Sequence, residues 1–278
     1  MRAKATSGFA GLAKACCLGL LAAGFPLHLA FAVDDAAQLF NSSPALSVRE
    51  AAAAPSVDEM RPLAAHAPKR ANFEMERASR EARHVADWVV DSGDNRSMPF
   101  AIVDKTDAKV FVFDADGRLH GAAPALLGLA KGDLAVPGIG NRPLSSIRPW
   151  ERTTPAGRFV AALGRNMHGV EILWVDYDGA VSMHPVIKGK PEERRAQRLA
   201  TPTPLDNRIS YGCINVPAKF FEHVVRPAFS GTYGIVYVLP EMMPARAVFA
   251  SYDVEERAQL QSASQAVSAK TAPGAAAH

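Results

Sequence analysis

Beyond Pro99 the apolar residues of this chain follow a period of two, and turn residues separate one short apolar run from the next. Such a period is typical of strands, because successive side chains of a strand point to opposite faces of a sheet. The predicted strands are 100–103, 110–113, 157–163, 170–177, 179–186 and 234–239. Asp178 and Gly179 join two of them as a hairpin. The segment 99–241 is therefore predicted to be one β-rich domain.

A longer period, close to that of a helix, precedes this domain. Its apolar positions recur at alternating spacings of three and four: Met75, Ala78, Ala82, Val85 and Val89. They predict an amphipathic helix over 72–90, within an N-terminal helical segment 71–98. A short helix is predicted over 217–226, and the apolar pattern fades after Pro244, so we expect 242–278 to be a mobile C-terminal tail. The predicted fold is mostly β with short peripheral helices.

The first 32 residues have the composition of a secretory signal. A basic start is followed by the apolar run 15–25 and by a small-x-small cleavage site at 30–32. The alternative is a retained anchor helix, but Pro26 and His28 interrupt the run before it reaches the roughly 20 apolar residues that a membrane span needs. We therefore expect cleavage after residue 32, export to the periplasm or cell wall, and no membrane span in the mature chain. Residues 33–70, rich in Ala, Ser and Pro, are predicted to be a flexible leader.

Composition and charge exclude several partners. The chain has 278 residues, 48% hydrophobic and 21% charged, with a formal net charge of +3. Arg2, Lys4 and Lys14 of the predicted signal account for that excess, so the mature chain has no net charge that would attract nucleic acid. Neither a Walker loop nor a dinucleotide fingerprint occurs in the sequence. We expect no cofactor, no metal and no nucleic-acid partner.

Removal of the signal would leave Cys213 as the single cysteine of an exported chain, since Cys16 and Cys17 lie within the signal. An unpaired thiol is a liability in an oxidising compartment. It is then an inert buried thiol, half of an intermolecular disulfide, or a reactive nucleophile. The sequence around it is compatible with a nucleophile, because Gly212 permits a sharp turn that presents the thiol together with neighbouring backbone N–H groups, and equally compatible with a cysteine packed on a strand between Gly212 and Ile214. Ser210 is placed to hold that turn through its hydroxyl.

A reactive thiol needs a proton acceptor, because an ordinary thiol with a pKa near 8.5 is mostly neutral at pH 7. His184 ends the predicted strand 179–184, and Ala180 and Ser182 share its face. Active-site groups commonly collect where a core strand passes into a polar loop. Position alone is also compatible with a structural role for His184. We take His184 as the candidate base and His168 as the reserve.

At these residues the chain resembles the YkuD-type L,D-transpeptidases. The resemblance lies in Ser210-Tyr211-Gly212-Cys213-Ile214-Asn215 preceded by His184, and in the segment 153–159, which is similar to the family's Thr-Pro-x-Gly-x-Phe. It covers roughly Pro99 to Pro240. It implies a β-sandwich of mixed sheets in which a cysteine attacks a peptidoglycan stem peptide, forms a thioester and passes the acyl group to an amine.

Carried over by position, Cys213 is the nucleophile and His184 is the base. The backbone amides of Tyr211, Gly212 and Cys213 form the oxyanion hole, while Ser210 and Asn215 hold the loop. Two residues depart from the family pattern: Tyr211 stands where the family has histidine, and Pro185 stands where a Ser, Thr or Gly is usual. A proline has neither the hydroxyl of Ser or Thr nor a backbone N–H. The loss of such a donor at position 185 would affect the orientation of His184.

An insertion over 188–207 separates the two parts of the motif and is longer than the family pattern. It is either a lid over the site or a solvated surface insertion. The function implied by the resemblance is L,D-transpeptidation of stem peptides. Two alternatives remain: an L,D-carboxypeptidase or hydrolase that uses water as the acceptor, and a non-catalytic peptidoglycan-binding relative. A papain-like protease is disfavoured, because its nucleophile precedes its histidine in the chain.

Overall fold

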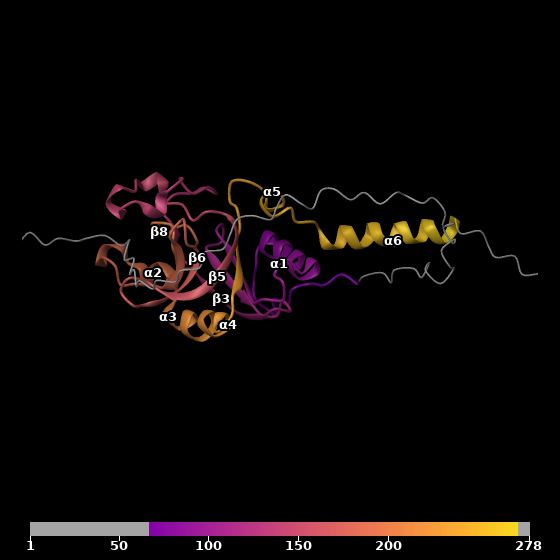
Figure 1. The fold of residues 1–278 in the computed structure, drawn as a ribbon, viewed down its shortest axis with the longest axis horizontal. Helices are drawn as coiled ribbons and strands as arrows, with labels where there is room; N and C mark the ends of the chain where they lie inside the picture. Colours follow the sequence, from indigo (N-terminus) through magenta and orange to yellow (C-terminus); the bar gives the residue numbers. More distant parts are fainter. Residues whose placement is uncertain (1–66, 272–278) are drawn as a thin grey trace, which may run out of the picture. The chain divides into compact units, whose positions relative to one another are not determined.

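The computed structural model describes residues 67–271, which form strands and helices (Figure 1). The predicted signal 1–32 and most of the leader 33–70 lie outside the described residues. The strands are β1 (Phe100–Asp104), β2 (Lys109–Phe113), β3 (Leu119–Pro124), β4 (Leu127–Gly128), β5 (Gly157–Arg165), β6 (Glu171–Asp176), β7 (Val181–Pro185), β8 (Arg208–Ser210), β9 (Ile214–Val216) and β10 (Gly234–Val238). The helices are α1 (Arg80–Ser92), α2 (Arg195–Ala200), α3 (Ala218–Phe220), α4 (Arg226–Phe229), α5 (Ala245–Phe249) and α6 (Val254–Thr271), with a π-helical turn, η6 (Phe221–Val225), between α3 and α4.

Eight of the strands form one mixed sheet in the order β3-β2-β1-β10-β5-β6-β7-β9, and β4 pairs with β8 in a second, two-stranded sheet. Strand β5 divides the large sheet into two halves, because its first part pairs with β10 and its second part with β6. Apolar side chains of both halves share one core: Ala101, Val103, Val110, Val112, Val236 and Val238 from the first, and Leu173, Val175, Met183, Ile214 and Val216 from the second. This shared core agrees with the sandwich-like, mostly β fold that we predicted.

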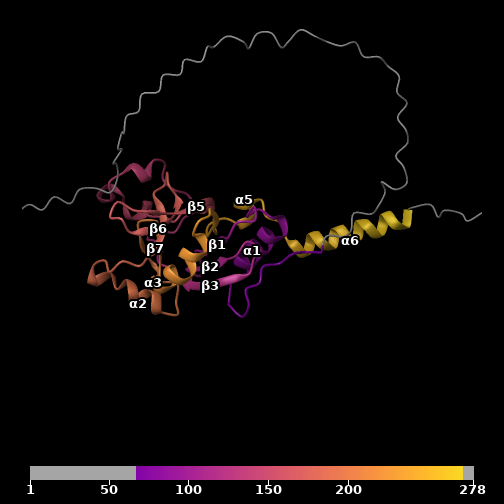
Figure 2. The same cartoon turned by 60° about the horizontal axis from the view of Figure 1, so that its bottom comes forward.

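The outer face of β1, β2 and β10 is covered by α1, so these strands are buried on both sides. Figure 2 shows α1 and α3 on opposite sides of β1 and β2. Phe100, Phe113 and Tyr237 face α1, and Phe100 stacks on Phe113 with ring centroids 4.8 Å apart. Aromatic burial of this kind stabilises the packing of a helix on a sheet. The N-terminal helix therefore belongs to the core of the β-rich domain.

The start of α1 differs from the sequence prediction, whereas its end agrees. The helix begins at Arg80, because the Ser79 hydroxyl caps it by accepting a hydrogen bond from the Ala82 N–H at 3.0 Å. Met75, which we placed on the apolar face, is 98% exposed and precedes the helix. Gly93 ends the helix with φ 70°, a left-handed conformation that glycine adopts without steric cost.

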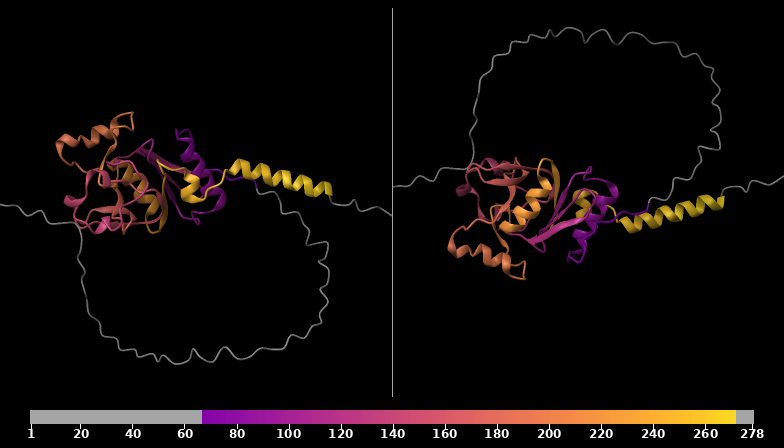
Figure 3. Two further views of the ribbon diagram at one scale, coloured as in Figure 1. Left: turned by 90° about the horizontal axis from the view of Figure 1, so that it is seen from above. Right: turned by 90° about the horizontal axis from the view of Figure 1, so that it is seen from below.

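The C-terminal segment also differs from its prediction. Residues 242–278 were expected to form a mobile tail, but they contain α5 and α6. Ala245 and Phe249 of α5 are buried in the core beneath α1. Figure 3 shows α6 beginning next to α1, where Arg257 lies 3.6 Å from Asp91. Within the described residues, no helix has both the length and the apolar character needed to cross a membrane.

Candidate active site

Parallel pairing of β7 with β9 brings the two parts of the sequence motif together. In this register Met183 lies opposite Ile214, and His184 lies opposite Asn215. Cys213 directly precedes β9, so it lies at the level of Ser182, whose Oγ is 3.6 Å from the Cys213 Sγ. The thiol and His184 are both partly buried. The sheet thus places the predicted nucleophile and base on adjacent strands.

Only glycine fits immediately before the cysteine. Gly212 has φ 133°, and a Cβ atom on it would lie 2.8 Å from the carbonyl oxygen of Thr153. The turn is fixed from the same side by Thr154, whose hydroxyl donates to the Gly212 carbonyl oxygen at 2.8 Å and accepts from the Gly128 N–H at 2.9 Å. The segment that resembles the family's Thr-Pro-x-Gly-x-Phe therefore supports the Cys213 turn directly.

Ser210 and Asn215, the two residues that the resemblance assigns to the loop, both hydrogen-bond to the Cys213 backbone. The Ser210 hydroxyl donates to the Cys213 carbonyl oxygen at 2.6 Å, and Asn215 Nδ2 donates to the same oxygen at 3.2 Å. Ser210 Oγ also accepts from the Gly212 N–H at 3.1 Å. Because Gly212 N–H is engaged in this way, the N–H groups of Tyr211 and Cys213 remain as candidate donors to an oxyanion.

His184 is oriented by the backbone of the residue that departs from the family pattern. Its Nδ1 lies 2.8 Å from the carbonyl oxygen of Pro185. A carbonyl oxygen only accepts, so Nδ1 carries the proton of this hydrogen bond. Nε2 is then the nitrogen that can interact with the Cys213 thiol, whose Sγ also lies 3.6 Å from the Ala180 carbonyl oxygen. Pro185 thus orients the imidazole without a hydroxyl.

The two groups shift each other's pKa in opposite directions. Burial raises the pKa of the Cys213 thiol, but the hydrogen bond and charge of His184, with two hydrogen bonds from Ser182, outweigh burial and hold it below the ordinary value. Burial and the charge of Arg195 lower the pKa of His184, yet the hydrogen bonds to Cys213 and Pro185 and the charge of the thiolate raise it overall. These shifts favour a thiolate–imidazolium pair.

Tyr211 lies at the surface beside the thiol. Its side chain is 37% exposed, and the Arg152 guanidinium is 3.9 Å from the centroid of its ring. A cation over an aromatic face is favourable at this distance. Arg152 also donates to the Ile147 carbonyl oxygen at 3.1 Å, which fixes the guanidinium. The tyrosine therefore belongs to the rim of the site, not to its proton-transfer groups.

The insertion 188–207 contacts the site through a residue that the sequence analysis missed. Arg195 of α2 donates from Nη1 to Asn215 Oδ1 at 2.8 Å and from Nε to Glu193 Oε2 at 2.6 Å. Its side chain is only 10% exposed. The insertion is therefore anchored to β9 through the Arg195 side chain, while its first part, 188–192, is exposed.

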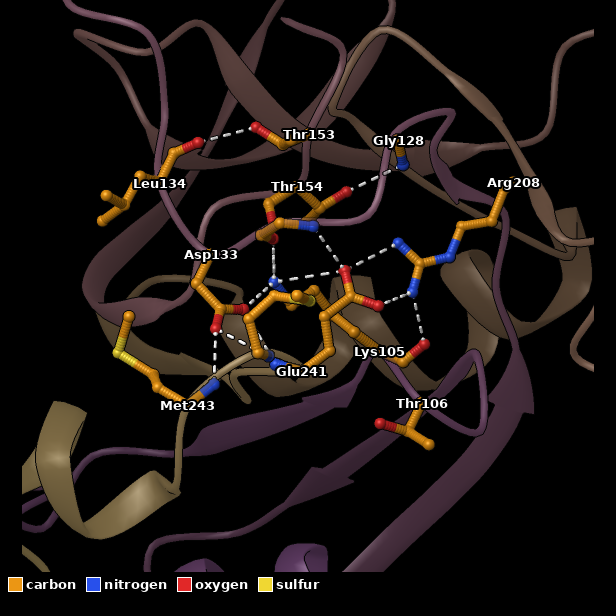
Figure 4. A network of polar contacts seen from close by, with 12 residues as sticks. Lys105, Thr106, Gly128, Asp133, Leu134, Thr153, Thr154, Arg208, Glu241 and Met243 are labelled. Atoms are coloured by element: carbon orange, nitrogen blue, oxygen red, sulfur yellow. Dashed lines mark hydrogen bonds and ion pairs between the residues drawn. The ribbon is translucent and has the colours of Figure 1, made fainter. Parts of the chain in front are cut away.

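A buried ionic cluster lies behind the Cys213 turn and was also missed (Figure 4). Lys105 Nζ donates to Asp133 Oδ1 at 2.8 Å and to the Thr154 carbonyl oxygen at 3.0 Å. Arg208, at the start of β8, pairs with Glu241 at 2.6 Å and donates to the Lys105 carbonyl oxygen at 2.8 Å. The cations Lys105 and Arg208 thus face the carboxylates of Asp133 and Glu241. The cluster supports both the segment that contains Thr154, which holds the Cys213 turn, and strand β8, which leads to that turn.

The remaining candidates lie apart from this arrangement. His168, the reserve base, is in the exposed connection between β5 and β6, where its backbone N–H donates to Asn166 Oδ1 at 2.9 Å. Among residues 67–271, no group of three or more His, Cys, Asp or Glu side chains is arranged to hold a metal ion.

No protein-family model and no curated protein matches this chain. Several solved structures do. The helical cell shape determining protein Pgp2 (K307A mutant) from Campylobacter jejuni matches with a TM-score of 0.36 and 16% identity, over 66% of this chain and 62% of that one. An L,D-transpeptidase from Mycobacterium tuberculosis matches with a TM-score of 0.31 and 15% identity, over 50% of this chain and 57% of that one.

A third match is the L,D-transpeptidase C442S mutant of Enterococcus faecium, with a TM-score of 0.30 and 18% identity, over 51% of this chain and 50% of that one. The chain is similar to L,D-transpeptidases of known structure. It spans about three fifths of the length of the Pgp2 chain and about half of the other two. The function proposed below is based on the geometry of the site.

Proposed function

We propose that the protein is an exported, cysteine-dependent L,D-transpeptidase that acts on peptidoglycan stem peptides. The observation that carries this proposal is the parallel pairing of β7 with β9, which places His184 and Ser182 beside Cys213, with Ser182 Oγ 3.6 Å from the Cys213 Sγ. A thiolate in a partly open turn next to an imidazolium is equipped for acyl transfer. The motif from Ser210 to Asn215 adds the substrate class through its resemblance to the YkuD-type family.

The reaction uses the two groups in succession. The Cys213 thiolate attacks the carbonyl carbon of a stem-peptide bond, and the N–H groups of Tyr211 and Cys213 stabilise the oxyanion. The carbon–nitrogen bond then breaks, and the His184 imidazolium gives its proton to the leaving amine, which leaves a thioester on Cys213. An amine of a second stem attacks the thioester, neutral His184 takes the proton of that amine, and the thiolate is released.

Mass spectrometry of the protein incubated with purified stem tetrapeptides tests this proposal. We expect a thioester adduct on Cys213 and a product in which two stems are joined. A free tripeptide as the only product would assign water as the acceptor and make the protein a carboxypeptidase.

Cys213→Ala is the matched variant for this experiment. It should lose both the adduct and the products and keep its fold, because the change removes one sulfur atom from a partly exposed position. Cys213→Ser should be nearly as inactive, since a serine hydroxyl is much harder to deprotonate. Turnover by Cys213→Ala within about tenfold of the unmodified chain would show that the cysteine is not the nucleophile.

A further inference from the structure

A cavity of about 280 Å³ lies between the chain that leaves β7 and the insertion that contains α2. Val186, Ile187 and Pro191 give it an apolar wall, and the cationic residues Lys188, Arg194 and Arg195 line it as well. It is outside the Cys213 turn, and neither the motif nor the proposed acyl-transfer chemistry accounts for it.

The charges around this cavity are unbalanced. No acidic residue lines it. Glu193 neutralises one of the three cations, because its carboxylate pairs with Arg195 at 2.6 Å. Two like charges around one small cavity repel each other and attract an anion, and a planar guanidinium is suited to a carboxylate. The lining therefore favours an anionic ligand that also presents an apolar part.

The cavity is connected to the reacting groups through Arg195. This side chain lines the cavity and also donates to Asn215, which in turn donates to the Cys213 carbonyl oxygen. Its charge lowers the pKa of His184, so it lies within electrostatic reach of the imidazole. On the other side of the cavity, the Val186 N–H extends the β7–β9 pairing by donating to the Val216 carbonyl oxygen at 2.8 Å.

The backbone of Arg194 is held in a conformation that residues other than glycine rarely adopt. Its φ is 44°, in the left-handed region, and its N–H donates to the Pro191 carbonyl oxygen at 3.2 Å. Left-handed backbone is unfavourable for residues with a Cβ atom and persists where the surroundings enforce it, often at binding sites. The turn before α2 therefore fixes where the Arg194 side chain begins.

We propose that this cavity binds a carboxylate of the peptide substrate, with Lys188 and Arg194 as the groups that recognise it. The proposal rests on the proposed function for the identity of the peptide. The carboxylate belongs either to a side chain of the stem peptide or to its C-terminus. The insertion thereby acts as a specificity element beside the thiol.

Binding and acylation of matched peptides test this proposal. The double variant Lys188→Gln/Arg194→Gln is compared with Lys190→Gln/Lys219→Gln, which removes the same charge from exposed residues that do not line the cavity. Three fluorescent stem peptides are used: the free acid, its C-terminal amide and its side-chain amide. The dissociation constant is measured on the Cys213→Ala background, and the rate of Cys213 acylation on the native cysteine.

We expect the cavity variant to bind the free acid about tenfold or more weakly, since hydrogen bonds to charged groups are the strong ones. The control variant should bind it as the unmodified chain does. Amidation of the carboxylate that occupies the cavity should weaken binding of the peptide to the unmodified chain. It should also remove the difference in affinity between the cavity variant and the control variant. The amide that has both effects identifies the carboxylate. Equal binding by both variants would overturn the proposal. Selective binding without any acylation of Cys213 would instead contradict the proposed function and leave the cavity assignment standing.

Discussion

The reactivity of Cys213 depends on one neighbouring side chain. Burial alone would raise the pKa of the thiol, and contact with His184 is the main influence that reverses this. The same contact raises the pKa of His184, although burial opposes it. The pKa of the thiol therefore lies below its ordinary value and the pKa of the imidazole above its own. Both shifts favour the charged pair over the neutral one.

Replacement of His184 by alanine should move the ionisation of Cys213 upward. Without the imidazole, burial remains the largest influence, so the pKa of the thiol should rise. We expect alkylation of Cys213 by iodoacetamide at pH 7 to slow by about 10²-fold or more, which is typical for loss of an activating base. The rate of alkylation from pH 5 to 9, measured by mass spectrometry, gives the pKa of the Cys213 thiol directly.

Two variants serve as controls for that pH profile. His168→Ala changes an exposed residue of the β5–β6 connection and should leave the profile of Cys213 unchanged. Tyr211→Phe keeps the ring beneath the Arg152 guanidinium and should change the rate only a few-fold at most. If His168→Ala gave the large loss and His184→Ala left the profile intact, the base would be His168.

Single residues of the site were predictable to different degrees. His184 was proposed because it ends an alternating strand, and Ser182, which the same alternation places on that face, lies next to Cys213 in the structure. Arg195 could not be found. Its contact with Asn215 depends on how the insertion folds back on β9, and no local period encodes that.

Among the elements, the Cys213 turn shows why local sequence and tertiary packing must agree. Gly212 needs its φ of 133° for the turn and needs its missing side chain because the Thr153 carbonyl oxygen lies where a Cβ would be. The two strands that flank the turn, β8 and β9, have only three residues each. So short a strand shows no period, and neither was predicted. Strand β9 forms by pairing with the longer β7, and β8 by pairing with the two-residue β4.

Substitution of Gly212 by alanine tests this arrangement. We expect Gly212→Ala to lower the free energy of unfolding by about 2 kcal/mol or more, because the cost of the left-handed backbone and the clash with the Thr153 carbonyl oxygen add. Gly231→Ala is the matched control, since Gly231 also has positive φ, 71°, but open space around its Cβ position. Urea denaturation measures both variants. Equal losses would show that the close approach to Thr153 costs nothing.

At the scale of the whole molecule, the buried ionic cluster joins parts of the chain that are far apart in sequence. Lys105 follows β1, Asp133 and Thr154 belong to the connection between β4 and β5, Arg208 begins β8, and Glu241 follows β10. Asp133 also accepts from the backbone N–H groups of residues 241–243. The overall strand content was predictable from periodicity, but a polar cluster between loops has no period and emerged only from the tertiary structure.

Loss of the Lys105 charge should therefore affect stability and the site together. Its side chain is fully buried, and Lys105→Met would leave the carboxylates of Asp133 and Glu241 with only Arg208 as a cation. Removing one partner of a buried ion pair typically costs about 3–5 kcal/mol. We expect a loss of that size in urea denaturation. Cys213 alkylation should also slow under folding conditions, because the Thr154 carbonyl oxygen loses its donor and Thr154 holds the Gly212 turn.

Arg246→Gln is the control for this last variant, because it removes a cation whose pair with Glu256, at 4.0 Å, is exposed. Exposed pairs contribute about 0–1 kcal/mol, so this variant should keep both its stability and its alkylation rate. A Lys105→Met protein that is as stable as Arg246→Gln would show that the cluster is dispensable for folding. One that is less stable but alkylated at the unmodified rate would show that the cluster does not support the site.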